Sequence, residues 1–340
     1  MRIFKIVLFS LLGLLILLII FWRVLFLFKP KPASQTNFGV TFSQKQADYL
    51  NSDWKTNYLA ILDDLKVKKI RLAVYWDLVQ KNPSSYDFSD LNWQLDEAQK
   101  RGVKVILAIG RRVPRWPECH IPQWAQNLPE KEQEKALLNY LDTIVTTYRG
   151  NKTLEMWQVE NEPSLNMFGN CPKRSRSFTK EEVKLVKSID PSHSVMTTDS
   201  GELATWLRNI NLTDYLGTSV YRTVYNNHFG YINYGHFLPP IFYKIRTKII
   251  GKNTDQIIIS ELQGEPWPPG SIKESGYSEI AKSMNEQKFI QNIEYAKFLG
   301  FSDIYLWGVE WWFFEKNKGN NYYWDTFKDY INSSNSKAAP

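Results

Sequence analysis

Two glutamates directly follow apolar segments of the sequence. Glu162 lies in the triplet Asn161-Glu162-Pro163, just after residues 154–159, and Glu261 follows the aliphatic residues 257–259 and one serine. A strand of aliphatic residues that ends in glutamate places the carboxylate at the rim of a domain, above an apolar floor. Two carboxyls in different surroundings can divide the work, one donating a proton and the other attacking as a nucleophile. The pair is therefore the first candidate for catalysis.

Neighbouring acids leave alternatives open. Glu162 could merely cap a following helix. Glu265 lies four residues after Glu261, so Glu261 could form a salt bridge at the rim while Glu265 acts in catalysis. Glu160 and Glu310 also end strands or begin loops, and we interpret both as supporting groups.

Eight apolar segments alternate with amphipathic ones and predict the elements that position these residues. The expected strands are 38–42, 69–75, 103–109, 154–159, 194–198, 215–221, 256–259 and 303–307, and the clearest helices are 57–65, 91–101, 130–148, 180–189 and 283–299. Strands with little alternation are buried on both faces, as in parallel sheets. Eight such units in one domain, residues 37–331, predict an α/β fold of the (β/α)₈ TIM-barrel type. A doubly wound sheet is the alternative, although no Gly-x-Gly-x-x-Gly and no P-loop follows any strand.

The N-terminus predicts a membrane anchor. Residues 6–22 carry no charge, and residues 24–28 extend the apolar run beyond Arg23, which is long enough to cross a bilayer. We expect a single-pass signal-anchor over residues 1–29, with residues 6–28 in the lipid, a linker at 30–36, and the domain outside the cell membrane. A cleaved signal peptide is the alternative. Residues 332–340 are expected to form a disordered polar tail.

Charge and composition exclude several classes of protein. Of 42 Lys and Arg residues, five lie within residues 1–31, where there is no acid, which leaves 37 basic residues against 35 acidic ones in the rest of the chain. The basic excess therefore does not indicate a nucleic-acid partner. Four His and two Cys show no metal-ligand spacing. We expect a monomer without metal or cofactor.

The strand ends together resemble a known group of enzymes. The sequence Trp157-Gln158-Val159-Glu160-Asn161-Glu162-Pro163, with Glu261 at the end of the seventh strand, is similar to clan A of the glycoside hydrolases, and most similar to the cellulase-like family 5 and to families 39 and 42. Arg71 in the second strand, Tyr221 ending the sixth and Trp307 ending the eighth match further positions of the clan. The resemblance extends over most of residues 37–331.

This resemblance implies a glycosidase that cleaves O-glycosidic, β-linked bonds of an oligo- or polysaccharide with retention. Glu162 would be the acid/base and Glu261 the nucleophile, and Arg71 and Tyr221 would stabilise the ionised form of Glu261. Asn161 would bind the sugar 2-hydroxyl. Arg71 in a purely structural ion pair, and Tyr221 as packing with Tyr225 in its role, are the alternatives. A transglycosylase of the same clan and an inactive polysaccharide-binding barrel are the competing functions.

Tryptophans are expected to line the substrate cleft, because sugars stack their C–H faces on aromatic rings. Seven of them fall at or just after predicted strand ends: Trp76, Trp116, Trp124, Trp267, Trp307, Trp311 and Trp312.

The loop after the third strand departs from the cellulase pattern. It carries Arg111 and Arg112, where many family 5 members carry a histidine. The two arginines would either bind an anionic group of the substrate or pair with nearby acids. Cys119 lies in this loop and Cys171 in the next one, so export of the domain would allow a disulfide between neighbouring loops.

Overall fold

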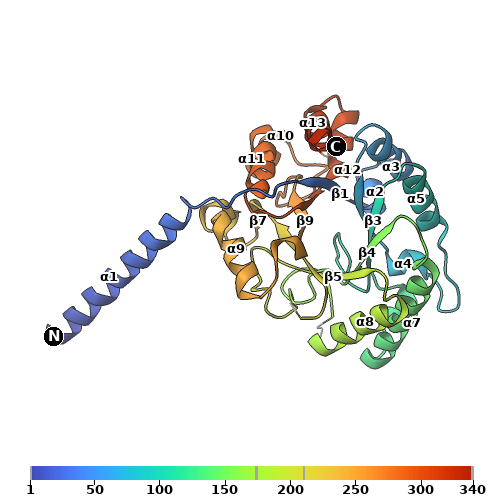
Figure 1. The fold of residues 1–340 in the computed structure, drawn as a ribbon, viewed down its shortest axis with the longest axis horizontal. Coiled ribbons are helices and arrows are strands. Elements are labelled where there is room, and N and C mark those ends of the chain that lie inside the picture. Colours follow the sequence, from blue (N-terminus) through green and yellow to red (C-terminus); the bar gives the residue numbers. More distant parts are fainter. Residues whose placement is uncertain (1, 173–174, 210, 338–340) are drawn as a thin grey trace.

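The computed structural model describes residues 2–172, 175–209 and 211–337. Eight parallel strands form a closed barrel in the order β1-β10-β9-β6-β5-β4-β3-β2, with helices around the outside (Figure 1). The barrel strands are β1 (Asn37–Phe42), β2 (Lys69–Ala73), β3 (Lys104–Ile109), β4 (Leu154–Val159), β5 (Ser194–Asp199), β6 (Tyr215–Val220), β9 (Ile257–Gln263) and β10 (Asp303–Trp307). The predicted (β/α)₈ barrel is confirmed, and the doubly wound sheet is excluded.

The α-helices connect the strands and cover the barrel, except for the N-terminal one, which projects from it. They are α1 (Arg2–Leu25), α2 (Gln44–Tyr49), α3 (Trp54–Asp63), α4 (Trp76–Val79), α5 (Ser89–Lys100), α6 (Gln123–Gln126), α7 (Glu130–Tyr148), α8 (Arg176–Ile189), α9 (Pro240–Ile249), α10 (Tyr277–Ser283), α11 (Glu286–Lys297), α12 (Val309–Asn317) and α13 (Tyr322–Lys337). Four of them begin at a side chain that accepts a backbone N–H of the first turn, namely Ser43, Asp53, Ser175 and Asn285. Each such cap stabilises its helix by about 1 kcal/mol.

Two apolar layers hold the barrel together. The larger lies between the strands and the helices, and a smaller cluster of Ile106, Met156, Met196, Ile258 and Tyr305 fills the barrel interior. Gly39 makes room for the Tyr305 ring, because a Cβ at this position would lie 2.9 Å from it. Inward and outward residues alternate along each strand, so Arg71, between Ile70 and Leu72, points inward with the interior cluster.

Several boundaries differ from those expected. Strand β9 continues through Gln263, so Glu261 lies within the strand rather than at its end. An antiparallel hairpin of β7 (Thr223–Asn226) and β8 (Gly230–Asn233) follows β6 and was not predicted. Helix α13 extends through Lys337, so most of the expected disordered tail is helical; residues 338–340 lie outside the described part.

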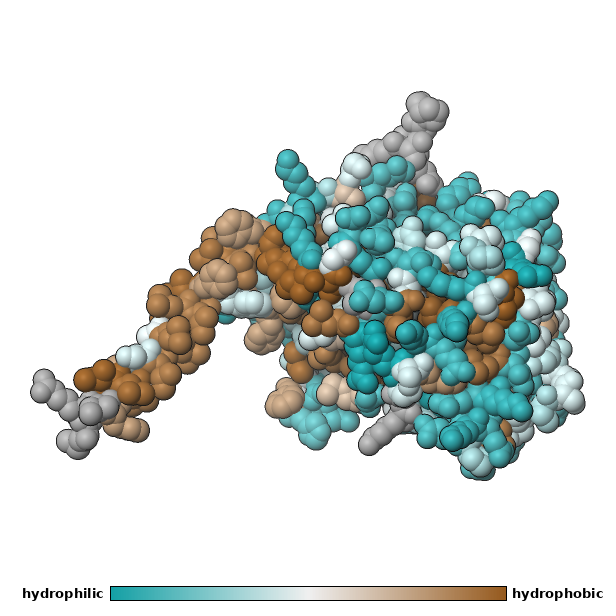
Figure 2. Space-filling view, turned by 60° about the horizontal axis from the view of Figure 1, so that its bottom comes forward, coloured by the Kyte–Doolittle hydropathy of each residue, from teal (hydrophilic) through white to brown (hydrophobic). Residues whose placement is uncertain are grey.

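The N-terminal helix projects from the barrel. Residues Phe4–Leu25 are long and apolar enough to cross a membrane, and they are not buried in the protein. Figure 2 shows this apolar helix running up to the side of the domain. There the Trp22 indole donates to the Phe237 carbonyl at 2.9 Å and its ring lies 5.8 Å from that of Phe242. The helix ends at Leu25, three residues before the expected end of the apolar span.

Candidate active site

A strained turn after β4 carries the first candidate carboxylate. Glu160 and Glu162 both have positive φ, at 61° and 43°, a conformation that is costly for side-chain-bearing residues and gathers at functional sites. The Glu160 carboxylate accepts the backbone N–H groups of Arg111 and Arg112, at 2.6 and 2.9 Å. Gly110 permits this approach, because a Cβ there would lie 2.3 Å from Glu160 Oε1. Glu162 does not cap a helix, since α8 begins only at Arg176.

The second candidate, Glu261, is held on both of its oxygens. The Arg71 guanidinium lies 3.0 Å from Oε1, and the Tyr221 hydroxyl donates to Oε2 at 3.0 Å. Both contacts stabilise a carboxylate in its ionised form. Burial and the charge of Glu261 raise the pKa of Tyr221 well above its usual value, so the phenol keeps its proton and remains a donor.

Arg71 joins the two candidate carboxylates within one buried network. Its Nε donates to Gln158 at 2.6 Å and its Nη2 to Asn161 Oδ1 at 2.8 Å. The Thr198 hydroxyl donates to the same Asn161 oxygen and accepts the backbone N–H of Glu162, at 2.9 and 2.8 Å. The guanidinium therefore holds Glu261 directly. Through its contact with Asn161, it also holds the turn on which Glu162 lies.

The surroundings of Glu162 favour its protonated form. Its side chain is buried, and its Oε1 lies 3.2 Å from the Ser219 hydroxyl. Burial raises the pKa of Glu162 well above the usual value, and the charges of Glu261, Glu118 and Asp199 raise it further against the opposing effect of Arg112. A carboxyl that remains protonated near neutral pH can act as a general acid.

A third carboxylate at this centre, Glu118, was not predicted. It lies in the loop after β3, where its Oε2 accepts from Asn161 Nδ2 at 3.2 Å and lies 3.6 Å from Arg112 Nε. Burial and the charge of Glu261 raise its pKa to about 7. In the sequence, only its position next to Cys119 links Glu118 to the site. The loop has no periodic pattern from which its course could be predicted.

Glu265 belongs to a separate ion-pair network. Arg115 lies between the carboxylates of Glu265 and Glu310, and the Trp307 indole donates to Glu265 at 2.7 Å. The Arg115 guanidinium also lies 3.9 Å from the centre of the Trp307 ring. Trp307 is 5% exposed, as is Glu261, and its contact with the sugar stays a prediction.

Aromatic rings form a row that leads to Glu261. The row consists of Trp116, Phe168, Trp267 and Tyr221, with successive ring centres 5.9, 5.7 and 5.2 Å apart. Trp116, at its outer end, is 62% exposed, which leaves a ring free to stack on a sugar. Phe168, from the loop after β4, was not among the expected residues.

Other expected cleft tryptophans lie in the protein core instead. Trp76 is 0% exposed and packs against Trp124 and Tyr140, while Trp311 is 1% exposed and packs against Tyr323. Trp312 is also fully buried. These tryptophans do follow strands, as expected. However, they lie in the first turns of α4 and α12, which direct their rings toward apolar neighbours. They cannot contact a substrate from these positions.

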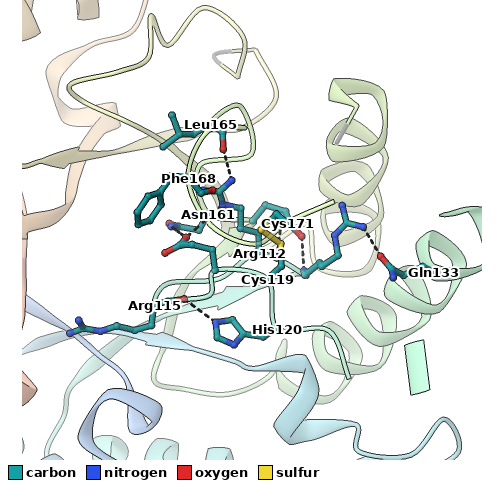
Figure 3. Close-up of a disulfide and its surroundings, with 12 residues drawn as sticks. Arg112, Arg115, Cys119, His120, Gln133, Asn161, Leu165, Phe168 and Cys171 are labelled. Carbon is teal, nitrogen blue, oxygen red and sulfur yellow. Dashed lines mark hydrogen bonds and ion pairs between the residues drawn. A yellow bond between two sulfur atoms is a disulfide. The ribbon is translucent and has the colours of Figure 1, made fainter. Parts of the chain in front are cut away.

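The loops after β3 and β4 are tied together, as Figure 3 shows. Cys119 and Cys171 form the expected disulfide, and the Asn170 N–H donates to the Pro117 carbonyl at 2.9 Å. Arg112 donates to the carbonyls of Leu165 and Phe168, at 2.6 and 3.1 Å.

The paired arginines therefore bind the protein itself. Arg111 donates to Gln133 at 2.7 Å and is, like Arg112, 4% exposed. Neither guanidinium is available to an anionic substrate in this arrangement. Among the described residues, no group of three His, Cys, Asp or Glu could hold a metal ion.

A closed parallel barrel that carries at its C-terminal end one glutamate held by an arginine and a tyrosine, and a second glutamate whose pKa is raised, has the construction of a barrel glycosidase. The sequence model of "Cellulase (glycosyl hydrolase family 5)" matches residues 33–264. The chain belongs to this family, and it is accordingly a glycoside hydrolase. A search of curated protein sequences found no match.

Solved structures with the same fold share little sequence with the chain. A GH5_18 protein from Streptomyces cattleya, in complex with GlcNAc, has a TM-score of 0.58 at 11% identity, over 81% of this chain and 70% of that one. An exo-β-1,4-mannosidase from Opitutaceae bacterium strain TAV5 has a TM-score of 0.61 at 14% identity, over 91% and 62%. A xylanase from Thermotoga petrophila has 0.53 at 14%, over 80% and 82%.

Proposed function

We propose that the protein cleaves β-linked saccharides with retention, using Glu162 as acid/base and Glu261 as nucleophile. The observation that carries this proposal is the contrast between the two carboxyls. Glu261 is bound by a guanidinium and a phenol that favour its ionised form, whereas burial and nearby charge keep Glu162 protonated. Retaining glycosidases divide their two carboxyls in this way.

In the first step, an oxygen of Glu261 attacks the anomeric carbon. The bond from that carbon to the leaving oxygen breaks, and the leaving oxygen takes the proton of Glu162. The products of this step are an ester between Glu261 and the sugar, the leaving group released as an alcohol, and an ionised Glu162. Asn161 is proposed to bind the 2-hydroxyl, a contact that strengthens as the transition state forms.

In the second step, Glu162 takes a proton from water, whose oxygen attacks the anomeric carbon and releases Glu261 as a carboxylate. Esterification removes the negative charge of Glu261, which is one cause of the raised pKa of Glu162. The pKa of Glu162 therefore falls when it must act as a base, and it rises again when Glu261 is released. An acceptor sugar in place of water would give transglycosylation.

Glu261 is favoured over Glu265 as the nucleophile because of their partners. Glu265 forms an ion pair with Arg115, which also pairs with Glu310, and it accepts a hydrogen bond from the Trp307 indole. Among the charges that raise the pKa of Glu162, that of Glu261 has the largest effect, and Glu261 shares Arg71 with Asn161. It therefore belongs to the network of the acid, and Glu265 does not.

We further propose a β-linked substrate whose sugars stack on the aromatic row. Among proteins of similar fold, one is an exo-β-1,4-mannosidase and another was crystallised with Manβ1-4GlcNAc. β-Mannosides are therefore the first substrates to test, followed by β-glucosides, β-galactosides and β-xylosides. The exposed ring of Trp116 is the proposed contact for the sugar that lies farthest from Glu261.

The mechanism can be tested by trapping the intermediate. The full chain in detergent is incubated with 2-deoxy-2-fluoro glycosides of these sugars, and the adduct is located by mass spectrometry. A label on Glu261 that is lost in Glu261→Gln and retained in Glu265→Gln is expected. A label on Glu265 would overturn the assignment of the nucleophile. Saccharide binding without any adduct or turnover would indicate the inactive binding barrel.

We also propose that residues 4–25 anchor the enzyme in the cell membrane with the barrel outside. The helix carries no charge over residues 6–22, and the disulfide suits an oxidising compartment. Intact mass of the protein from isolated membranes is expected to show the N-terminal segment still present. In right-side-out vesicles, added protease should digest the domain. A mature protein that starts near residue 30 would instead indicate a cleaved signal peptide.

A further inference from the structure

We propose that Glu202 is a positioning residue that acts on the acid/base through the hydroxyl of Ser219. Glu202 lies in the loop after β5, Ser219 in β6 and Glu162 after β4. The proposal rests on the role of Glu162 given above. It adds a group that no sequence motif indicated and whose hydrogen-bond partners include Ser219, Tyr221 and Tyr243.

The Ser219 hydroxyl lies between the carboxyl groups of Glu162 and Glu202. Its Oγ is 3.2 Å from Glu162 Oε1 and 3.0 Å from Glu202 Oε2, and it accepts the backbone N–H of Gly201 at 3.1 Å. Ser219 is 2% exposed. Its register partner across β6 and β9 is Glu261, so the hydroxyl lies at the level of the catalytic centre.

A hydroxyl has one hydrogen and therefore donates fully to one of these carboxylates at a time. While Glu162 is protonated, the Ser219 hydroxyl is free to donate to Glu202. After Glu162 has given up its proton, its new negative charge attracts the same hydrogen, and Glu202 loses that donor. Ionisation of Glu162 is thus coupled to the hydrogen bonding of Glu202.

The other oxygen of Glu202 is fixed. Its Oε1 accepts the backbone N–H of Tyr221 at 2.8 Å and the hydroxyl of Tyr243 at 3.2 Å. Burial raises the pKa of Glu202 to about 7, against the effects of these donors and of Arg246. A glutamine at this position would have to turn its carbonyl toward Tyr221 and Tyr243, which leaves its amide N–H groups facing Ser219.

This orientation sets the direction of the expected shifts. In Glu202→Gln the amide donates to Ser219, so the serine hydrogen remains with Glu162, stabilises the ionised acid and lowers its pKa. In Ser219→Ala the ionised acid loses a donor, so the pKa of Glu162 rises. The charges that also face Glu162, namely Glu261, Glu118, Asp199 and Arg112, are unchanged in both variants.

The test measures kcat/KM against pH for the full chain in detergent with a phenyl glycoside, whose poor leaving group needs the acid. The alkaline limb reports loss of the proton of the acid. We expect it to move down by about 0.7 pH unit in Glu202→Gln and up by a similar amount in Ser219→Ala. In the double variant, Glu202→Gln should add no shift to that of Ser219→Ala. Glu155→Gln, at the opposite end of β4, controls for the loss of one negative charge.

Two results would overturn the proposal. One is an alkaline limb that Glu202→Gln leaves unchanged; the other is a shift from Glu202→Gln that is equally large in the wild-type enzyme and in Ser219→Ala. Titration of the Glu162 carboxyl by ¹³C NMR, assigned with Glu162→Gln, should show the same shifts without turnover. An enzyme inactive on every glycoside would contradict the proposed function, and this titration would still decide the coupling.

Discussion

Tyr221 donates a 3.0 Å hydrogen bond to Oε2 of Glu261. The phenol follows β6, and its ring packs edge-on against Trp267, with ring centres 5.2 Å apart. One side chain therefore joins the aromatic row to the proposed nucleophile, so sugar stacking and orientation of the carboxylate depend on the same ring.

Tyr221→Phe should lower kcat/KM by about 10- to 100-fold, because it removes a hydrogen bond to a charged group while keeping the ring. The melting temperature should hardly change, since the contact with Trp267 remains. Steady-state kinetics and thermal unfolding of the variant test this expectation. Tyr225→Phe is the matched control; a larger loss in that variant would give its role to Tyr225.

Glu118→Gln should move the alkaline limb of kcat/KM to lower pH by about one unit. The charge of Glu118 is one of those that raise the pKa of Glu162, so its removal makes the acid ionise earlier. Since the pKa of Glu118 is itself about 7, its charge is present above that pH. The shift should persist in Ser219→Ala, which separates it from the effect of Glu202; a limb that stays in place would contradict this role.

Arg115→Met should destabilise the protein by about 3–5 kcal/mol, because it leaves two buried carboxylates without their cation. The loss should be larger at pH 8 than at pH 5. Burial already raises the pKa of Glu310 to about 7, with Glu265 adding to the effect and Arg115 opposing it. Without Arg115 the pKa of Glu310 rises further, and its protonation at pH 5 removes part of the cost. Urea unfolding at both pH values provides the measurement; equal losses would count against a charge effect.

Trp116→Ala and Trp76→Ala should have opposite consequences. The exposed Trp116 should change stability by less than about 0.5 kcal/mol and should raise KM for oligosaccharides. The buried Trp76 should cost about 3–5 kcal/mol of unfolding free energy, with KM unchanged for the fraction that folds. Unfolding curves and KM for both variants decide the matter. An unaltered KM in Trp116→Ala would remove this ring from the substrate site.

Replacing both Cys119 and Cys171 by serine should lower the free energy of unfolding by about 4 kcal/mol, the chain-entropy value for a loop of this length. The residues are 52 positions apart. The reduced wild-type protein should match the double variant in denaturant unfolding. A stability that does not respond to reductant would show that hydrogen bonds alone, such as those of Arg112, hold the two loops together.

The barrel and the contacts of Glu261 could be predicted because both follow from strand order. Once eight parallel strands close, inward residues such as Arg71 meet residues from β9 without any knowledge of loops. The sequence also placed Cys119 beside Cys171, because consecutive loops are neighbours at the same end. Strand β9 continues two residues beyond Glu261, but Glu261 still lies beside Ser219 and the other residues of the proposed site.

The loops could not be predicted in the same way. Glu118 and Glu202 lie in segments without periodicity, where the chain path depends on turns and tertiary contacts. Trp76 and Trp311 follow strands as expected, but their exposure depends on the short helices that begin there. A tryptophan after a strand gives no sign of which way its ring will face, so core and substrate-facing rings look alike in the sequence.

Arg71 has a consequence for how this enzyme can diverge. Its guanidinium contacts side chains or carbonyls of β1, β4 and β9, including Thr41, Gln158 and Ser260, and it is fully buried. Replacing Gln158, the acceptor of the Arg71 Nε, would leave a buried donor unmatched next to Glu261. A change at the bottom of the site must therefore alter β2 and β4 together, whereas the aromatic rings of Trp116 and Phe168 at the rim can each be replaced alone. New sugar preferences should arise at that rim.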